Sequence, residues 1–152
     1  AVAADVLLFL HADTALPENA DALVRGAMLG PCAWGRFDVR IDSPRPLLAL
    51  VSTMINLRSR WSGMATGDQA IFIRHDLFQR VGGFPDLPLM EDIAMCRLLK
   101  RHGRPACLRE RVCTSGRRWE QRGVWRTIVL MWRLRWAYWR GASPQVLARR
   151  YE

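Results

Sequence analysis

Short apolar runs alternate along the chain with segments of helical periodicity, and this alternation is typical of an α/β domain. Residues 6–10 form a continuous apolar run, which predicts a strand buried on both faces. Residues 37–41 alternate between apolar and charged side chains, which predicts a strand with one face in water. Shorter strands are predicted at residues 70–73 and 106–112.

Proline and glycine mark the ends of the predicted helices. Pro17 begins a helix that extends to about residue 29, and Pro46 begins one that extends to about residue 60. The second helix carries apolar side chains on one stripe, as a helix packed on a core does. The stripe consists of Leu47, Leu50, Val51, Met54 and Leu57. Further helices are predicted at residues 76–81, 91–102 and 123–139, and from Ser143 onward.

The composition is that of a globular domain. Of the 152 residues, 50% are hydrophobic and 24% are charged, which excludes an intrinsically disordered chain. No run of about 18 uncharged apolar residues is present, so no membrane-spanning helix is predicted. Residues 1–10 lack the charged first part of a signal peptide and lead directly into a strand. We therefore expect that this chain is a domain cut open at its start.

The four cysteines show neither CxxC spacing nor a Cys/His pattern of metal ligands. They are Cys32, Cys96, Cys107 and Cys113. All four stand in apolar surroundings, so we expect reduced, buried thiols and a cytoplasmic protein.

The formal net charge is +9, and Lys100 is the only lysine among the 23 basic residues. Arginine binds phosphate through two parallel hydrogen bonds. Three classes of partner fit this charge: nucleic acid, an anionic membrane surface and a phosphorylated substrate. Composition alone does not choose among them.

Two groups of polar residues stand next to predicted strands. His11 and Asp13 follow the first strand, at the sheet edge where α/β proteins bind ligands, and a carboxylate there can hold Mg²⁺ or Mn²⁺. Asp68 and Gln69 follow Gly67 and precede the strand at 70–73, where they can bond hydroxyl groups. A helix cap and an ordinary turn explain the same residues without any ligand.

A third group is the acidic pair Glu91–Asp92 at the start of a predicted helix. The field of the helix N-terminus favours ionised carboxylates, and an ionised carboxylate can act as a general base. Acidic residues are also common at helix starts for structural reasons alone, so both interpretations stay open.

Three segments, taken in order, resemble family 2 glycosyltransferases. They are LLFLHADT at 7–14, GDQAIFIRHDLFQRVGGFP at 67–85 and LPLMEDIAMCRLLKRHGR at 87–104. A bacterial subgroup is similar also at TSGRRWEQRG, residues 114–123. The resemblance implies a GT-A fold, which is a Rossmann-like mixed α/β sheet flanked by helices. Residues 1–152 would form one such domain, truncated at the N-terminus and ending in a helical tail at 123–152.

The resemblance also implies an activity, which is inverting transfer of a sugar from a nucleotide-sugar donor to an acceptor hydroxyl. Asp13 matches the last acid of the family's DxD motif, which holds a divalent metal, Mn²⁺ or Mg²⁺. Asp92 matches the base that takes the acceptor proton, and Glu91 would support it. Gly83 and Phe84 would shape the acceptor pocket, and Asp68 would lie beneath the donor sugar.

The chain departs from the family pattern in two places. His11 stands where the first acid of the DxD motif is usual, and imidazole is a softer metal ligand than carboxylate, so His11 is expected to contact ribose or phosphate instead. The βα units that bind the nucleotide would precede residue 1. We therefore expect weak or no activity from these residues alone, and an exposed sheet edge through which a homo-oligomer could form.

The basic end of the chain has two candidate roles. By analogy with the family, Arg117, Arg118 and Trp119 would close over the donor diphosphate, although a surface salt-bridge role is the alternative. Along the helix at 123–139, Arg126, Arg133 and Arg140 recur every seven residues and form one stripe, and apolar residues cover most of the rest. This helix either packs on the sheet or on a partner chain, or it lies in the interface of a membrane, which would be the inner face of the cell membrane.

Three other functions compete with sugar transfer. A hydrolase with paired carboxylates needs two acids across a cleft, and no such pair is specified. A nucleic-acid-binding module fits the charge, but the tryptophans are on a predicted helix and not on strands. A non-catalytic remnant that acts as an interaction domain fits the chain as well.

Overall fold

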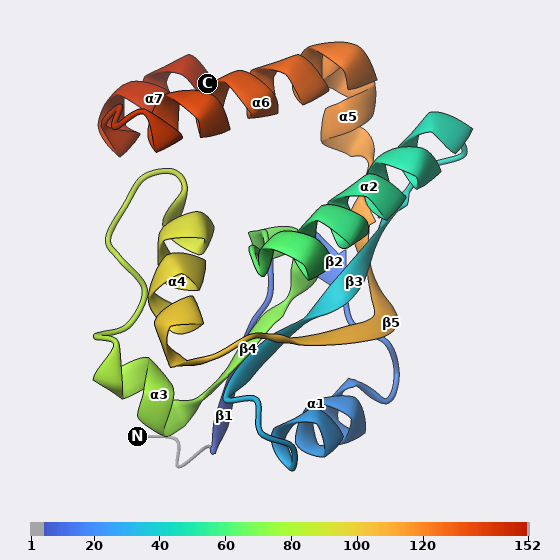
Figure 1. Ribbon diagram of the computed structural model, residues 1–152. Helices are drawn as coiled ribbons and strands as arrows, with labels where there is room; N and C mark the ends of the chain where they lie inside the picture. The colour runs from blue at the N-terminus through green and yellow to red at the C-terminus, as the bar shows by residue number, and fades with distance from the viewer. Residues whose placement is uncertain (1–4, 152) are drawn as a thin grey trace.

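The computed structural model describes residues 5–151, which fold into a mixed α/β structure around a curled mixed sheet (Figure 1). The order of strands in the sheet is β1-β4-β3-β5-β2. The strands are β1 (Val6–Phe9), β2 (Thr14–Ala15), β3 (Trp34–Asp42), β4 (Ile71–Arg74) and β5 (Ala106–Ser115). The helices are α1 (Ala20–Met28), α2 (Pro46–Ser62), α3 (His75–Arg80), α4 (Glu91–Leu99), α5 (Arg117–Arg122), α6 (Val124–Trp139) and α7 (Pro144–Tyr151), with the 3₁₀ turns η1 (Gly67–Gln69) and η2 (Lys100–His102).

The strand pairing is antiparallel except between β3 and β5, which are parallel. β1 is the outer strand beside β4, and its four residues are half-buried. The prediction that the run at 6–10 is a strand is confirmed, but the prediction that both its faces are buried is wrong, because β1 lies at an edge of the sheet.

The central strand β3 buries charge that the sequence pattern predicted to be in water. Arg36 and Asp38 are both buried and form an ion pair, and Arg60 of α2 donates to the other carboxylate oxygen of Asp38 at 2.7 Å. The prediction of a wet face on this strand is therefore wrong for Asp38, whereas Arg40 is exposed as predicted. A carboxylate held between two guanidinium groups is compensated inside the protein.

Helix α2 buries its polar side and exposes its apolar stripe. β3 pairs with β4 only at Trp34 and Gly35, so the backbone of β3 beyond them needs other partners on that edge. Asn56 supplies them, because its side-chain amide donates to the carbonyl oxygen of Val39 and accepts from its N–H, both at 2.9 Å. Ser52 accepts from the N–H of Ile41 at 3.0 Å.

The predicted packing face of this helix is wrong for three of its five residues, while Leu47 and Val51 pack, partly buried, against the cluster of Ile41, Leu48 and Val124. Leu50, Met54 and Leu57 of the apolar stripe are 57% to 60% exposed. The polar residues Ser52 and Asn56 are buried because the unpaired edge of a strand needs hydrogen bonds more than it needs apolar contact.

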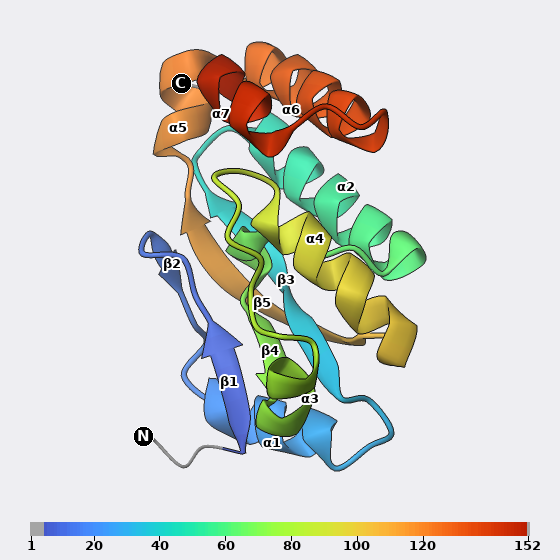
Figure 2. The same cartoon turned by 90° about the vertical axis from the view of Figure 1, so that its left-hand side faces the viewer.

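Separate apolar clusters cover the two faces of the sheet. α1 packs through Val24 and Met28 on a cluster that contains Phe37, while α3 and α4 pack on the cluster around Trp34. α6 and α7 lie together at the end of the molecule opposite α1 (Figures 1 and 2). Within the described residues no helix is long and apolar enough to cross a bilayer.

The four cysteines are unpaired, but only Cys96 is buried. Burial raises the pKa of the Cys96 thiol to about 12, which makes it unreactive at neutral pH. The prediction of burial is wrong for Cys32, Cys107 and Cys113, which are half-buried.

Candidate active site

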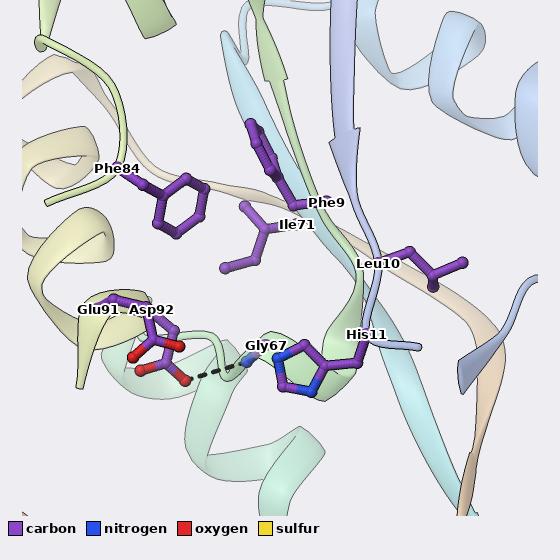
Figure 3. A pocket seen from close by; sticks show the side chains of 8 residues that line it. All are labelled: Phe9, Leu10, His11, Gly67, Ile71, Phe84, Glu91 and Asp92. Carbon is purple, nitrogen blue, oxygen red and sulfur yellow. Dashed lines mark hydrogen bonds between the residues drawn. The ribbon is translucent and has the colours of Figure 1, made fainter. Parts of the chain in front are cut away.

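Three segments that are distant in the sequence meet at one small cavity (Figure 3). The cavity has a volume of about 210 Å³. It lies between the end of β1, the turn η1 with the start of β4, and the start of α4. The residues that line it are Phe9, Leu10, His11, Gly67, Ile71, Phe84, Glu91 and Asp92. His11, Glu91 and Asp92 were candidate site residues from the sequence, and they share this cavity.

Gly67 joins the two sides of the site. Its backbone N–H donates to Asp92 Oδ2 at 3.0 Å. A Cβ atom at this position would stand only 2.1 Å from His11 Nε2, so the imidazole rests directly against the glycine. Glycine is required here because it lets a side chain approach the backbone this closely.

The backbone on both sides of the cavity adopts an uncommon conformation. Ala70, which ends η1, has φ of 47°, and Met90, which precedes α4, has φ of 67°. They are the only non-glycine residues with positive φ in residues 5–151. Such residues cost about 1 kcal/mol or more each and are enriched at functional sites. The turn at Met90 directs Glu91 and Asp92 at the start of α4 toward the cavity.

Asp92 is the most perturbed acid of the site. Burial raises its pKa from 3.8 to about 6, and the negative charge of Glu91 contributes in the same direction. Hydrogen bonds from the N–H groups of Gly67 and Ile93 oppose the rise in pKa. Desolvation therefore outweighs the two backbone hydrogen bonds that favour the ionised carboxylate. A pKa near 6 still leaves the group mostly ionised at pH 7 and makes it a better base than an ordinary aspartate.

Arg58 of α2 lies behind the acidic residues. Burial lowers the pKa of this guanidinium, and the charges of Asp68 and Asp92 act in the opposite direction. Its Nε is buried and makes no hydrogen bond within the described part of the chain. No motif in the sequence pointed to Arg58. The signal that could have found it is the polar stripe of Ser52, Asn56 and Ser59 beside it, which has the same helical spacing as the apolar stripe.

Asp68 and Gln69, the two candidate site residues in the turn η1, have different surroundings. Gln69 is fully buried, and its side-chain amide donates to the carbonyl oxygen of Phe37 and to Asn56 Oδ1, both at 3.4 Å. Together with Thr66 it forms the capping box of η1. Asp68 accepts a hydrogen bond from the hydroxyl of Thr66. Gln69 therefore supports the turn and does not face the cavity.

Gly83 and Phe84, which precede α4, also differ in their positions relative to the cavity. Phe84 lines the cavity, and its ring packs edge-on against Phe9 with centroids 4.6 Å apart. Gly83 has φ of 80° and packs on Phe78 at the end of α3. Gly83 thus makes the turn that brings Phe84 to the cavity.

Asp13 is not among the residues that line the cavity. It is exposed in the turn between β1 and β2, where its carbonyl oxygen accepts from the N–H of Ser115 at 3.2 Å. Residues 5–151 contain no group of three His, Cys, Asp or Glu side chains placed to hold a metal ion. Asp13 supplies one carboxylate, and a divalent cation takes about six oxygen ligands, so the others would have to come from water or from a bound molecule.

Arg117, Arg118 and Trp119 belong to α5 and do not line the cavity. Trp119 packs against the cluster of Ile41, Leu48 and Val124. The structure thus uses the tryptophan to attach α5 to the body of the protein. Comparison of the chain with protein-family models, curated proteins and solved structures found no match.

Proposed function

We propose that the chain is the acceptor-side part of a glycosyltransferase of the GT-A type, with Asp92 as the base that takes the proton of the acceptor hydroxyl. The observation that carries the proposal is the half-buried Asp92 carboxylate, with a pKa of about 6, in a cavity shared with His11. The resemblance of the segments at 7–14 and 67–104 to family 2 glycosyltransferases supports it.

The cavity has the chemistry of a sugar subsite. Phe9, Ile71 and Phe84 provide an apolar wall for the C–H face of a pyranose, while Asp92 and Glu91 accept hydrogen bonds from hydroxyl groups. Each oxygen of Asp92 already accepts one backbone hydrogen bond, which fixes the carboxylate and leaves a second lone pair on each oxygen for the substrate.

The reaction would be a single displacement with inversion. The acceptor oxygen forms a bond to C1 of the donor sugar, and the bond between C1 and the diphosphate oxygen breaks. The electron pair of that bond leaves with the diphosphate, and Asp92 takes the acceptor proton. A divalent cation, when bound, neutralises charge on the diphosphate. Glu91 raises the basicity of Asp92 through its own charge.

His11 and the basic residues would serve the donor side. The imidazole of His11 lies across the cavity from Asp92 and can donate an N–H to a phosphate or ribose oxygen (Figure 3). Arg117 and Arg118 would have to move toward the cavity to reach a diphosphate, so we propose them for donor closure only.

A pair of carboxylates for glycoside hydrolysis is less favoured by the geometry. Glu91 and Asp92 are the only acids that line the cavity, and they are neighbours on one helix start. Hydrolysis of that kind needs acids on opposite sides of the bond that breaks.

The test is a transfer assay with the full-length protein, a panel of nucleotide sugars and monosaccharide acceptors, and Mn²⁺ or Mg²⁺. We expect a new glycoside whose anomeric configuration, read by NMR, is opposite to that of the donor. Absence of transfer from every donor, with the protein folded, would count against the proposal. Hydrolysis of simple glycosides instead would replace it by the hydrolase alternative.

A further inference from the structure

Helix α6 carries a row of exposed tryptophans on the side that faces away from the protein. The row consists of Trp125, Val129, Trp132, Trp136 and Trp139, which follow one another at intervals of three or four residues and so share one face of the helix. These five side chains are between 51% and 75% exposed. The opposite face packs on the protein through Val124, Thr127 and Leu134, which are buried. The tryptophan stripe is therefore not part of the core.

Arginines border the stripe. Arg126 and Arg133 are exposed and lie along one edge of it, and neither forms an ion pair within the described residues. Arg140 lies over the ring of Trp136, with its guanidinium carbon 4.8 Å from the ring centroid. Between residues 121 and 151 the sequence contains seven arginines and no acidic residue. This end of the protein therefore presents positive charge together with aromatic surface.

A hollow of about 300 Å³ is lined by residues of α5 and α6. It receives guanidinium groups from Arg122 and Arg126, an amide from Gln121 and an apolar wall from Leu130, while the hydroxyl of Thr127 already donates to the carbonyl oxygen of Gly123 at 2.9 Å. Guanidinium groups around a hollow suit a phosphate group better than they suit an apolar side chain.

We propose that the tryptophan stripe of α6 docks the protein on an anionic lipid surface, with Arg126 and Arg133 on the lipid phosphates. Tryptophan is enriched at the headgroup level of bilayers, where its apolar ring and its N–H are both satisfied. A helix with an apolar face and basic borders lies in the plane of the interface, held by apolar burial and by attraction to anionic lipids. The stripe does not suit nucleic acid as well, because bases stack on aromatic rings that are spaced along a groove.

Docking through α6 would also place the cavity close to the lipid. Met90, directly before the acidic pair of α4, packs with Leu134 of α6 and Leu147 of α7 in one cluster. The start of α4 is therefore about one helix diameter, roughly 10 Å, from the docked face. α6 and α7 form one end of the molecule (Figures 1 and 2), and the stripe on α6 is exposed there.

Vesicle flotation tests the proposal directly, with the unmodified chain, vesicles of phosphatidylcholine alone and vesicles of phosphatidylcholine mixed with phosphatidylglycerol. We expect flotation with the mixed vesicles and loss of it at high salt. The double variant Arg126→Gln/Arg133→Gln should bind roughly 25-fold more weakly, since each arginine near an anionic surface contributes about fivefold. The double variant Trp132→Ser/Trp136→Ser should bind the mixed vesicles at least about 10-fold more weakly than the unmodified chain does.

A matched control changes one apolar and one basic residue at the opposite end of the molecule. Leu29→Ser/Arg25→Gln removes a side chain that is 90% exposed after α1 and an arginine within α1, and it should bind the vesicles as the unmodified chain does. Circular dichroism of each variant checks that the fold is kept.

Three results would overturn the proposal. The first is equal flotation of the Trp132→Ser/Trp136→Ser variant and the control. The second is a dimer in sedimentation velocity that the same variant abolishes, because the stripe would then be an interface between copies. The third is binding of a single-stranded oligonucleotide that is stronger than vesicle binding and that displaces the protein from vesicles.

Discussion

Replacement of Gly67 by alanine should change the geometry of the site while leaving the stability of the fold nearly unchanged. The new methyl group would stand 2.1 Å from His11 Nε2 and 2.7 Å from Cε1. Ordinary contacts between such atoms are about 3.5 Å, so the imidazole must move by roughly 1 Å or more. His11 is exposed and its ring can rotate outward, and Gly67 is not one of the glycines with positive φ. We therefore expect the free energy of unfolding to change by less than about 1 kcal/mol.

Activity should respond far more than stability. A displacement of about 1 Å at a reacting centre can reduce the rate by about 100-fold, and we expect a loss of this order in sugar transfer. The assay combines urea unfolding, transfer kinetics and the NMR position of the His11 ring. Gly26→Ala is the control, because a Cβ at Gly26 meets nothing within 4 Å and alanine favours a helix by up to about 1 kcal/mol over glycine. The reasoning is refuted if Gly67→Ala displaces His11 and transfer stays within about threefold of the unmodified protein.

Three further predictions follow from Asp92 and from α2. The pKa of Asp92 in the folded protein lies above its ordinary value, so the folded protein holds this proton more tightly than the unfolded chain does. The free energy of unfolding should therefore fall by up to about 3 kcal/mol as the pH rises from about 4 through 6, and urea unfolding across that range measures it. Glu91→Gln removes a charge that raises this pKa, so the pH midpoint of transfer activity should move below about 6; an unchanged or higher midpoint would contradict the assignment. Asn56→Ala leaves the N–H and carbonyl of Val39 without partners and should lower the free energy of unfolding by about 2–5 kcal/mol. Leu50→Ser, on the exposed stripe, should change it by less than about 0.5 kcal/mol. Equal costs of the two variants would contradict the orientation of α2.

The sequence predicted the kinds and places of the main elements well, because strands and helices leave local patterns. The apolar run at 6–10, the helix begun by Pro46 and the helix at 123–139 all appear within a few residues of their predicted bounds. β2 and α5 were not predicted. A strand of two residues and a helix of six are too short to leave a period.

The orientation of α2 could not be predicted from its own pattern. Its apolar stripe is regular, but the sheet presents an unpaired strand edge at Val39 and Ile41 to this helix. Which strands pair, and where the pairing stops, is a long-range property of the fold. For the same reason Asp38, which is buried in an ion pair with Arg36, looked like part of the wet face of a strand.

The candidate site could be predicted in part. The sequence pointed to His11, Phe84 and the acidic pair, and these residues do share one cavity. The direction of the pKa shift of Asp92 could not be predicted, because it depends on burial by segments far away in the chain. Asp13 was expected to hold a divalent metal at the site, but the chain turns after His11 and leaves Asp13 exposed outside the cavity.

The most direct test of the central claim compares sugar transfer by the unmodified protein and by Asp92→Asn, with the same donor, acceptor and metal. Asparagine keeps the shape of the side chain and cannot take a proton, so we expect a loss of about 10²–10⁴-fold in kcat with little change in donor binding. Glu110→Gln, which neutralises an exposed acid on β5, should leave kcat unchanged. Transfer by Asp92→Asn at the rate of the unmodified protein would contradict the assignment of Asp92 as the base.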